Sequence, residues 1–222
     1  MYFDSSYILL IVVTLAIGLG SQAWVKSALS KYQNVPIASG LTGAQAAKQM
    51  LSYYGVDIPV QMGQEGQDFF DPSTNSITLS PSAFNTSNIT SLATACHECG
   101  HACQYATGYS MMKFRTALVP VVNLCSNAWI IVFMIGIFLN LAGFAWLAIG
   151  LYAATVLFAL VTLPVEFDAS SRAIKYMKTI NIDQSEVKGS EKVLRACAFT
   201  YVAAMLASLL QLFYLIGQAQ RR

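Results

Sequence analysis

Charged residues are scarce in this chain of 222 residues. Asp, Glu, Lys and Arg together make up 11% of it and hydrophobic residues 55%, whereas a soluble domain carries about 25% charged residues. This composition indicates that lipid, rather than water, surrounds much of the protein. The formal net charge is only +2, so the chain lacks the basic field that holds phosphate backbones, and we expect no nucleic-acid partner.

We also expect neither a disulfide framework nor a cleaved signal peptide. The five cysteines are odd in number, and Cys96, Cys99 and Cys103 crowd into one short segment, which favours a reducing compartment. Residues 1–4 contain no Lys or Arg before the first apolar run. We therefore expect that run to be a permanent membrane anchor.

Long apolar runs are what the sequence has in abundance. One transmembrane helix takes about 20 mainly apolar residues, and the runs at 7–24 and 196–217 each suffice for one crossing. The uncharged stretch 116–165 is long enough for two crossings, with a turn near 140–143. The sequence thus predicts a mainly α-helical integral membrane protein with four transmembrane helices and a small cytoplasmic α+β portion.

Two polar segments, 25–115 and 166–195, separate these spans and carry most of the basic residues. Because the hairpin between them crosses twice, both segments face the same side of the membrane. The excess of Lys and Arg assigns that side to the cytoplasm and the N-terminus to the outside. Arg221 and Arg222 would then also lie outside, against the rule.

Local signals outline the first polar segment. Thr42 is a suitable N-cap for a helix through about Tyr54, and residues 71–75 have the composition of a turn. Residues 76–80 alternate between polar and apolar side chains as a short edge strand does. Apolar side chains then recur at three- and four-residue steps between capping residues and a glycine, which predicts an amphipathic helix over 88–107.

This helix carries the sequence His97-Glu98-Cys99-Gly100-His101, an H-E-x-x-H pattern. Residues four apart lie on the same face of a helix, so both imidazoles can reach one zinc ion. Glu98 can then accept a proton from the water that attacks a peptide carbonyl. Paired histidines can also be ordinary hydrogen-bonded side chains, but these two are the only histidines in the chain, so chance is a poor explanation of their spacing.

A catalytic zinc site needs a third protein ligand, and the chain has no third histidine. The extended H-E-x-x-H-x-x-G-x-x-H pattern fails at Thr107, so the ligand is a carboxylate or a thiolate. Cys96 and Cys99 have a zinc-like spacing, but they share a helix stripe with Cys103 and Leu92, away from the imidazole face. We expect these cysteines to pack in the core.

Five carboxylates follow the motif, namely Glu166, Asp168, Asp183, Glu186 and Glu191. Glu166 directly follows the third span, where membrane packing would fix its position, and the last three fall in a polar loop. Glu166 and Asp168 could equally form an interfacial charge pair with Arg172. The residues alone leave both interpretations open.

Further segments extend the pattern over nearly the whole chain. In order, they are Phe70-Asp71-Pro72, Leu79-Ser80-Pro81, His97 to Gln104, Lys113 to Pro120, Leu163 to Ser170, Leu194 to Ala196 and Thr200 to Ala204. Together they resemble the YugP-type family of neutral zinc metallopeptidases of bacterial membranes. At Phe69 the chain departs from that family, where we would expect a histidine.

The resemblance implies a gluzincin-like site, similar to that of the HtpX and CAAX-processing membrane proteases, in which a downstream glutamate is the third zinc ligand. That position falls on Glu166. Asp168 and Arg172, in the same stretch, would support the ligands or the substrate.

We therefore predict one membrane-embedded peptidase domain over 1–222, a multi-pass zinc endopeptidase of the cell membrane that processes or controls the quality of membrane proteins. A metal transporter is a poorer hypothesis because the four spans contain no Asp, Glu, His, Lys or Arg. An inactive zinc-containing scaffold or peptide-binding protein is the remaining alternative. The presence of Glu98 argues against this scaffold alternative, because a structural zinc site does not require a glutamate that activates water.

Overall fold

The computed structural model describes residues 5–139, 141–180 and 182–220. The chain divides into two compact units. Unit 1 comprises residues 1–22, 113–163 and 199–222, and unit 2 comprises residues 23–112 and 164–198.

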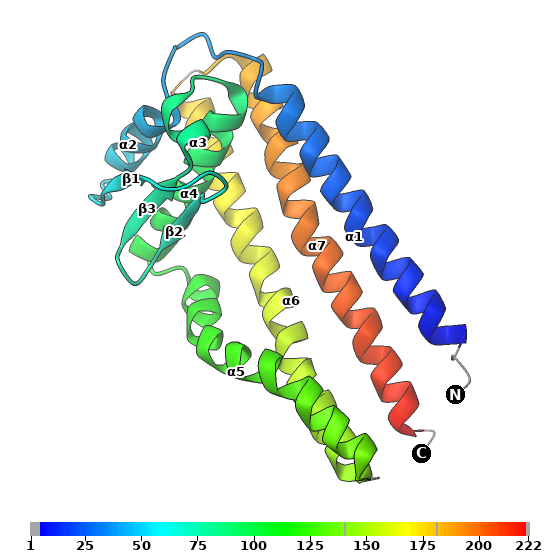
Figure 1. Cartoon of the computed structure of the whole chain (residues 1–222). Coiled ribbons are helices and arrows are strands. Elements are labelled where there is room, and N and C mark those ends of the chain that lie inside the picture. Colours follow the sequence, from blue (N-terminus) through cyan, green and yellow to red (C-terminus); the bar gives the residue numbers. More distant parts are fainter. Residues whose placement is uncertain (1–4, 140, 181, 221–222) are drawn as a thin grey trace. The chain divides into compact units, whose positions relative to one another are not determined.

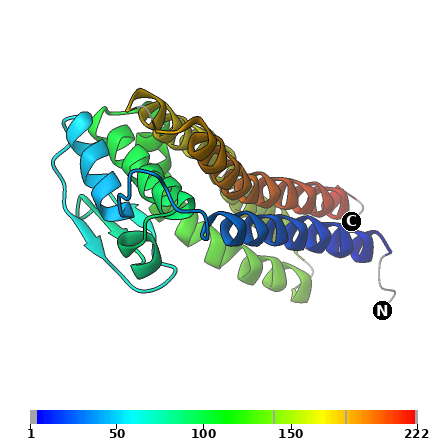
Figure 2. The same ribbon diagram turned by 90° about the horizontal axis from the view of Figure 1, so that it is seen from above.

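Unit 1 is built from parts of four long helices that have the length and composition to cross a membrane. Tyr7 contacts Tyr214, and Trp129 contacts Tyr152, at ring-centroid distances of 5.2 and 4.8 Å. These pairs join the first helix to the last and the two middle helices to each other (Figures 1 and 2). The four helices are α1 (Ser5–Tyr32), α5 (Ser110–Phe138), α6 (Ala142–Thr179) and α7 (Gln184–Gln220).

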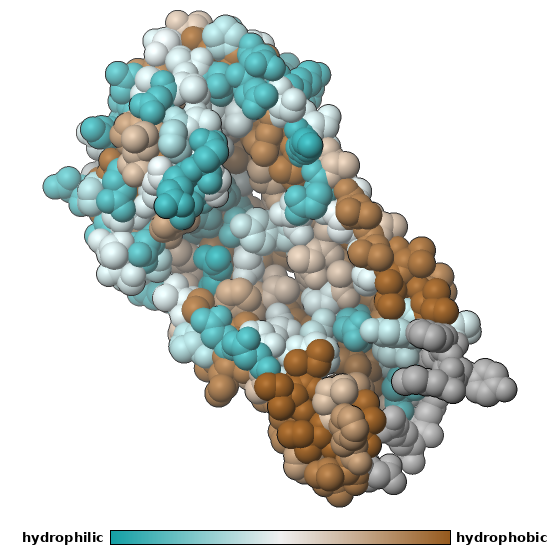
Figure 3. Space-filling view, in the orientation of Figure 1, coloured by the Kyte–Doolittle hydropathy of each residue, from teal (hydrophilic) through white to brown (hydrophobic). Residues whose placement is uncertain are grey.

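The outer surface of unit 1 is apolar. Leu124 and Phe138 on α5 are 70% and 81% exposed, which would be costly in water but is expected of side chains that face lipid. Hydrophobic side chains gather on the helices of this unit in Figure 3. The prediction of a mainly α-helical membrane protein with four spanning helices is confirmed.

Some sequence arguments rest on positions that lie outside the described residues. These positions are 1–4, Asn140, Arg221 and Arg222. Of the predicted hairpin, the structure therefore gives the end of α5 at Phe138 and the start of α6 at Ala142.

The second polar segment is mostly helical. The loop predicted for the last three carboxylates holds for Asp183 but was wrong for Glu186 and Glu191, which belong to α7. Helix α6 continues to Thr179, and α7 begins at Gln184. In α6, Val165, Ala169 and Ala173 are fully buried. Their four-residue spacing makes an amphipathic stripe that packs in unit 2, so the helix continues beyond the apolar run.

Unit 2 contains a small three-stranded sheet and three shorter helices, with α4 packed against α2 and against strands β2 and β3 (Figure 1). Thr42 caps α2 in a capping box with Gln45, which confirms the predicted start of that helix. The helices are α2 (Gly43–Tyr53), α3 (Pro81–Asn85) and α4 (Ile89–Ala106), and the strands are β1 (Val60–Met62), β2 (Phe69–Asp71) and β3 (Ser76–Leu79).

Strand β3 is the central strand of the sheet, not the edge strand that its alternating pattern predicted. The order is β1-β3-β2, with β1 parallel and β2 antiparallel to β3. All four residues of β3 are buried. Its polar side chains have partners, since Thr78 accepts a hydrogen bond from Gln61 and Ser76 shares one with Thr74, so polarity did not require an exposed face.

Helix α4 forms where the sequence predicted it. Asn88 caps its start, and Gly108 follows its C-cap with a positive φ of 67°, a conformation that glycine adopts without strain. The side chains of Leu92, Cys96 and Cys99 are buried in the core of unit 2. The other face of α4 holds the histidines.

Candidate metal centre

His97 and His101 lie one turn apart on α4, with ring centroids 4.7 Å from each other. Each ring has a partner at Nδ1. That of His97 lies 3.2 Å from the hydroxyl of Ser170, and that of His101 lies 3.0 Å from the side-chain oxygen of Gln104. The Nε2 atoms of both rings are therefore the ones that face a shared ligand.

Glu166 of α6 supplies that shared contact. Its Oε2 atom lies 3.3 Å from Nε2 of His97 and 3.6 Å from Nε2 of His101. The glutamate is 2% exposed. Residues separated by 69 and 65 positions in the sequence thus meet in the interior of unit 2.

A glycine allows this close approach. A Cβ atom at Gly100 would lie 2.5 Å from the carbonyl oxygen of Ala169 and 2.9 Å from its Cα. Helix α4 therefore packs directly against the backbone of α6, three residues beyond Glu166.

The three donor atoms fit a zinc ion. The ligand atoms of His97, His101 and Glu166 all lie within 4.8 Å of one another. Zn–N and Zn–O bonds of about 2.0–2.2 Å in a tetrahedron place ligand atoms roughly 3.3–3.6 Å apart, and both histidine–glutamate distances fall in this range. Two imidazoles and one carboxylate also form a known donor set of catalytic zinc.

Electrostatics at His101 favour positive charge. Burial by itself would lower its pKa, but the hydrogen bond with Glu166 and the negative charges of Glu98 and Glu166 outweigh burial and raise the pKa. The same arrangement that stabilises a proton on the ring attracts a cation to it, so proton and metal compete for one position.

Glu98 lies beside the cluster on α4 and is 7% exposed. Its Oε2 atom accepts a hydrogen bond of 2.9 Å from the backbone N–H of Phe70. Phe70 lies opposite Ile77 in the antiparallel pairing of β2 with β3, but neither N–H is used between these two residues. The N–H of Phe70 donates to Glu98, and the N–H of Ile77 donates to the carbonyl of Pro59, on the side of β3 away from β2. The polar backbone groups of Phe70 thus point away from β3, and the free edge of β2 faces Glu98.

The cysteines of α4 are neutral core residues. Burial raises the pKa of Cys96 to about 12 and that of Cys103 to about 11, and it raises the pKa of Cys99 well above the ordinary value. A thiol must lose its proton to bind zinc, and burial opposes that loss. Within the described residues, the His, Cys, Asp and Glu groups close enough to hold a metal reduce to His97, His101 and Glu166.

Asp168 and Arg172 form an ion pair one turn apart, with 2.6 Å between Asp168 Oδ2 and Arg172 Nε. This is the charge pair that the sequence left open, but it takes Asp168 and not Glu166. Asp168 also accepts a hydrogen bond from Gln104, which in turn contacts His101. The pair therefore reaches the histidine through a residue that sequence reasoning had not singled out.

The later carboxylates have other partners. Asp183 accepts a hydrogen bond from the N–H of Ser185 at the start of α7, and Glu186 accepts one from the N–H of Ala38. Glu191 forms an ion pair with Arg195.

Four residues at the site escaped the sequence analysis: Phe70, Gly100, Gln104 and Ser170. Gln104 lies three residues after His101 in the sequence, and this helical spacing on the histidine face was the signal that could have identified it. The contacts of Phe70 and Ser170 had no sequence signal. Phe69, where the related pattern led us to expect a histidine, lies on β2 and is 42% exposed.

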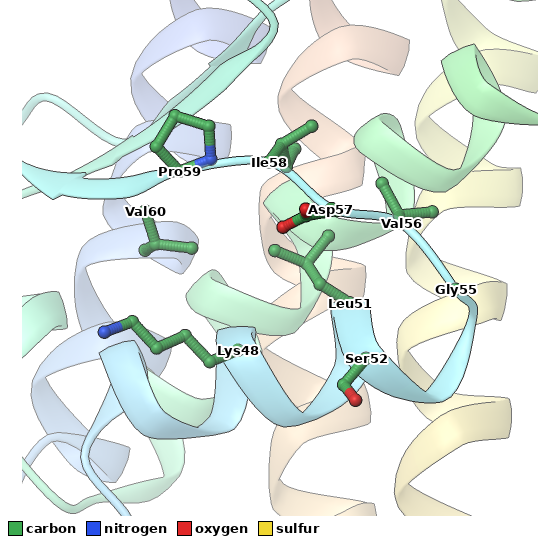
Figure 4. A pocket seen from close by; sticks show the side chains of 9 residues that line it. All are labelled: Lys48, Leu51, Ser52, Gly55, Val56, Asp57, Ile58, Pro59 and Val60. Atoms are coloured by element: carbon green, nitrogen blue, oxygen red, sulfur yellow. The ribbon is translucent and has the colours of Figure 1, made fainter.

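A separate open pocket of about 670 Å³ lies in unit 2 between α2 and the segment that leads into β1. Figure 4 shows Lys48, Leu51 and Ser52 on the helix side, and residues 55–60 complete the lining. It contains none of the metal-cluster residues.

Comparison with known proteins agrees with this chemistry. A family model described as "Putative neutral zinc metallopeptidase" matches residues 7–220. The chain is 38% identical over 209 residues to the "Putative membrane protease YugP" of Bacillus subtilis (strain 168), and the match covers 93% of each sequence. No solved structure matches the chain. Since the family match runs through all four apolar helices and all three residues of the candidate metal cluster, the protein belongs to the neutral zinc metallopeptidase family, as the sequence resemblance predicted.

Proposed function

We propose that this protein is a membrane-bound zinc endopeptidase whose metal is held by His97, His101 and Glu166 and whose general base is Glu98. The observation that carries the proposal is that three donor atoms from two helices lie close together. The Nε2 atoms of His97 and His101 lie 3.3 and 3.6 Å from Oε2 of Glu166. Zinc bound there would activate a water molecule and polarise the carbonyl of the peptide bond.

Glu98 moves the proton. Its Oε2 atom is held by the N–H of Phe70, which orients the carboxylate and leaves Oε1 to accept the proton from the attacking water. The same carboxyl group then donates the proton to the nitrogen of the departing amine. Burial of Glu98 keeps bulk water from competing for this proton.

The substrate is proposed to bind as an extended strand. The free edge of β2 carries the carbonyl of Phe70 next to Glu98, and an extended peptide can add to such an edge through backbone hydrogen bonds. Backbone pairing places a peptide bond beside the general base without requiring a particular side chain. Exposed Phe69 on the same strand would favour apolar side chains in the substrate.

The proposed setting is the cytoplasmic side of the cell membrane, with the N-terminus outside. Its support is the distribution of Lys and Arg in the two polar segments. Glu166 follows the apolar run by one residue, so membrane-protein segments or peptides near the lipid are the proposed substrates, in processing or quality control. Cleavage of soluble casein as readily as of a membrane-embedded substrate would contradict this substrate class.

The test of the mechanism is the purified full-length Glu98→Gln variant. We expect it to retain one zinc ion per chain, because Glu98 is not a ligand, and to lose at least about 10²-fold in peptidase activity, the usual contribution of a general base. Glu191→Gln, in the exposed ion pair with Arg195, serves as the matched control and should keep wild-type activity.

Full activity of Glu98→Gln would refute the general base. If the wild type binds zinc but cleaves none of a broad panel of peptides and membrane proteins, the scaffold alternative replaces the endopeptidase.

A further inference from the structure

Gln104 is a buried polar residue without an assigned role. It lies one turn after His101 on α4, and its relative exposure is 0%. Its side chain makes three hydrogen bonds. The Oε1 atom lies 3.0 Å from Nδ1 of His101, and the Nε2 atom donates to the carbonyl of Val165 at 2.7 Å and to Oδ2 of Asp168 at 2.8 Å.

The partners fix which way the amide points. The carbonyl of Val165 is an acceptor only, and the Asp168 carboxylate, paired with Arg172, is also an acceptor. Both must therefore face the NH₂ group of Gln104. The oxygen of the amide is then left facing His101, and because that oxygen cannot donate, the hydrogen on this contact belongs to Nδ1 of the imidazole.

A proton on Nδ1 leaves the lone pair on Nε2. That is the nitrogen that lies 3.6 Å from Glu166 Oε2, in the metal cluster. We propose that Gln104 is the positioning residue of the metal centre. It selects the tautomer of His101 that can bind zinc and ties α4 to α6, the helix that carries the third ligand.

The contact of the other imidazole is less restrictive. Nδ1 of His97 faces the hydroxyl of Ser170 at 3.2 Å, and a hydroxyl can donate or accept. Gln104 is an amide with a fixed orientation, so the two histidines differ in how firmly their tautomers are set. His97 is therefore a comparison within the same molecule.

The wild-type protein provides the first test. Full-length protein in detergent micelles is loaded with zinc and labelled with ¹⁵N in its histidine rings, and because the chain has only two histidines, NMR observes just their four ring nitrogens. We expect Nδ1 of His101 to carry a proton that exchanges slowly with water, and Nε2 to carry none. A His101 ring that binds zinc through Nδ1 and is protonated at Nε2 overturns the proposal, whatever happens in any variant.

The second test is Gln104→Met, which has a similar length but removes the amide. Loss of such a supporting partner typically weakens metal binding by about 10–100-fold, and we expect a loss in this range when zinc is titrated against a competing chelator. Fast exchange of the His101 Nδ1 proton, with the His97 signals unchanged, should accompany it. Ile77→Val, which trims the core of unit 2 at a residue that belongs neither to the metal cluster nor to the contacts of Gln104, is the control for reduced stability and should bind zinc as the wild type does.

Wild-type zinc affinity and slow exchange of the His101 proton in Gln104→Met would overturn the positioning role. The inference rests on the proposed metal centre, so wild-type protein that binds no zinc overturns both. Zinc-loaded wild type with a protonated His101 Nδ1 and no peptidase activity supports the role of Gln104 and overturns only the catalytic proposal.

Discussion

Gly100 sits inside the zinc motif at the closest approach of α4 and α6. An added Cβ atom would lie 2.5 Å from the carbonyl oxygen of Ala169 and 2.9 Å from its carbonyl carbon and Cα. These are backbone atoms, which cannot rotate out of the way as the end of a side chain can. The substitution Gly100→Ala therefore has to move one helix relative to the other.

The size of the effect follows from these distances. Real Cβ atoms essentially never approach a neighbour closer than 3.0 Å, so the 2.5 Å contact must open by at least half an ångström. Overpacking of this kind costs about 1–3 kcal/mol, against a gain of about 1 kcal/mol from replacing glycine by alanine within a helix. We expect a net loss of stability of up to about 2 kcal/mol.

Metal binding should suffer more than folding. The clash lies three residues from Glu166, and ligand distances in zinc sites tolerate deviations of only about 0.2 Å. Displacing α6 carries Glu166, the proposed third ligand, away from both imidazoles. We expect zinc affinity to fall about 10-fold or more, comparable to the loss of a supporting partner.

The assay is thermal unfolding and chelator-competed zinc titration of the full-length protein. Gly150→Ala is the matched control, because a Cβ atom at Gly150, in the membrane part of α6, meets nothing within 4 Å. It should unfold and bind zinc as the wild type does. Wild-type zinc affinity in Gly100→Ala would refute the claim that direct backbone packing positions Glu166.

Three further predictions concern the metal. Glu166→Ala should fold but lose zinc in the competition titration, since two imidazoles remain of three ligands; full occupancy would move the third ligand elsewhere. Cys103→Ala should retain one zinc ion per chain by metal analysis because the thiol is neutral and buried, and a lost ion would restore the thiolate alternative. Zinc at 100 times its Kd stabilises a protein by about 2.7 kcal/mol, so a chelator should lower the Tm and abolish activity, with both restored by added zinc; a Tm and activity insensitive to the chelator would contradict a bound metal.

Local patterns in the sequence were sufficient to predict a large part of the secondary structure. Runs of apolar residues determine where membrane helices form, because every backbone polar group in lipid must be bonded within its own segment. Capping residues and three- to four-residue spacing placed α2 and α4, and two histidines four apart share a helix face by geometry alone. Each of these signals involves residues that are close together in the sequence, so the sequence alone can reveal it.

Other features depended on neighbours that the linear pattern does not contain. The alternation in residues 76–80 predicted an edge, but whether a strand lies at an edge depends on which strands pair with it, and β1 and β2 both pair with β3. The sequence also did not predict that the third span continues as a helix beyond Glu166 to Thr179, because that continuation depends on buried side chains of α6 that pack in unit 2.

The metal centre shows the same division most clearly. The sequence alone predicted the imidazole pair and Glu98 as site residues, and family resemblance pointed to Glu166. Only the tertiary structure brought that carboxylate to within 3.3 Å of His97 and placed Gln104 between His101 and Asp168. Contacts across more than 60 residues depend on how two helices pack, and here that packing rests on a glycine that lets one backbone touch another.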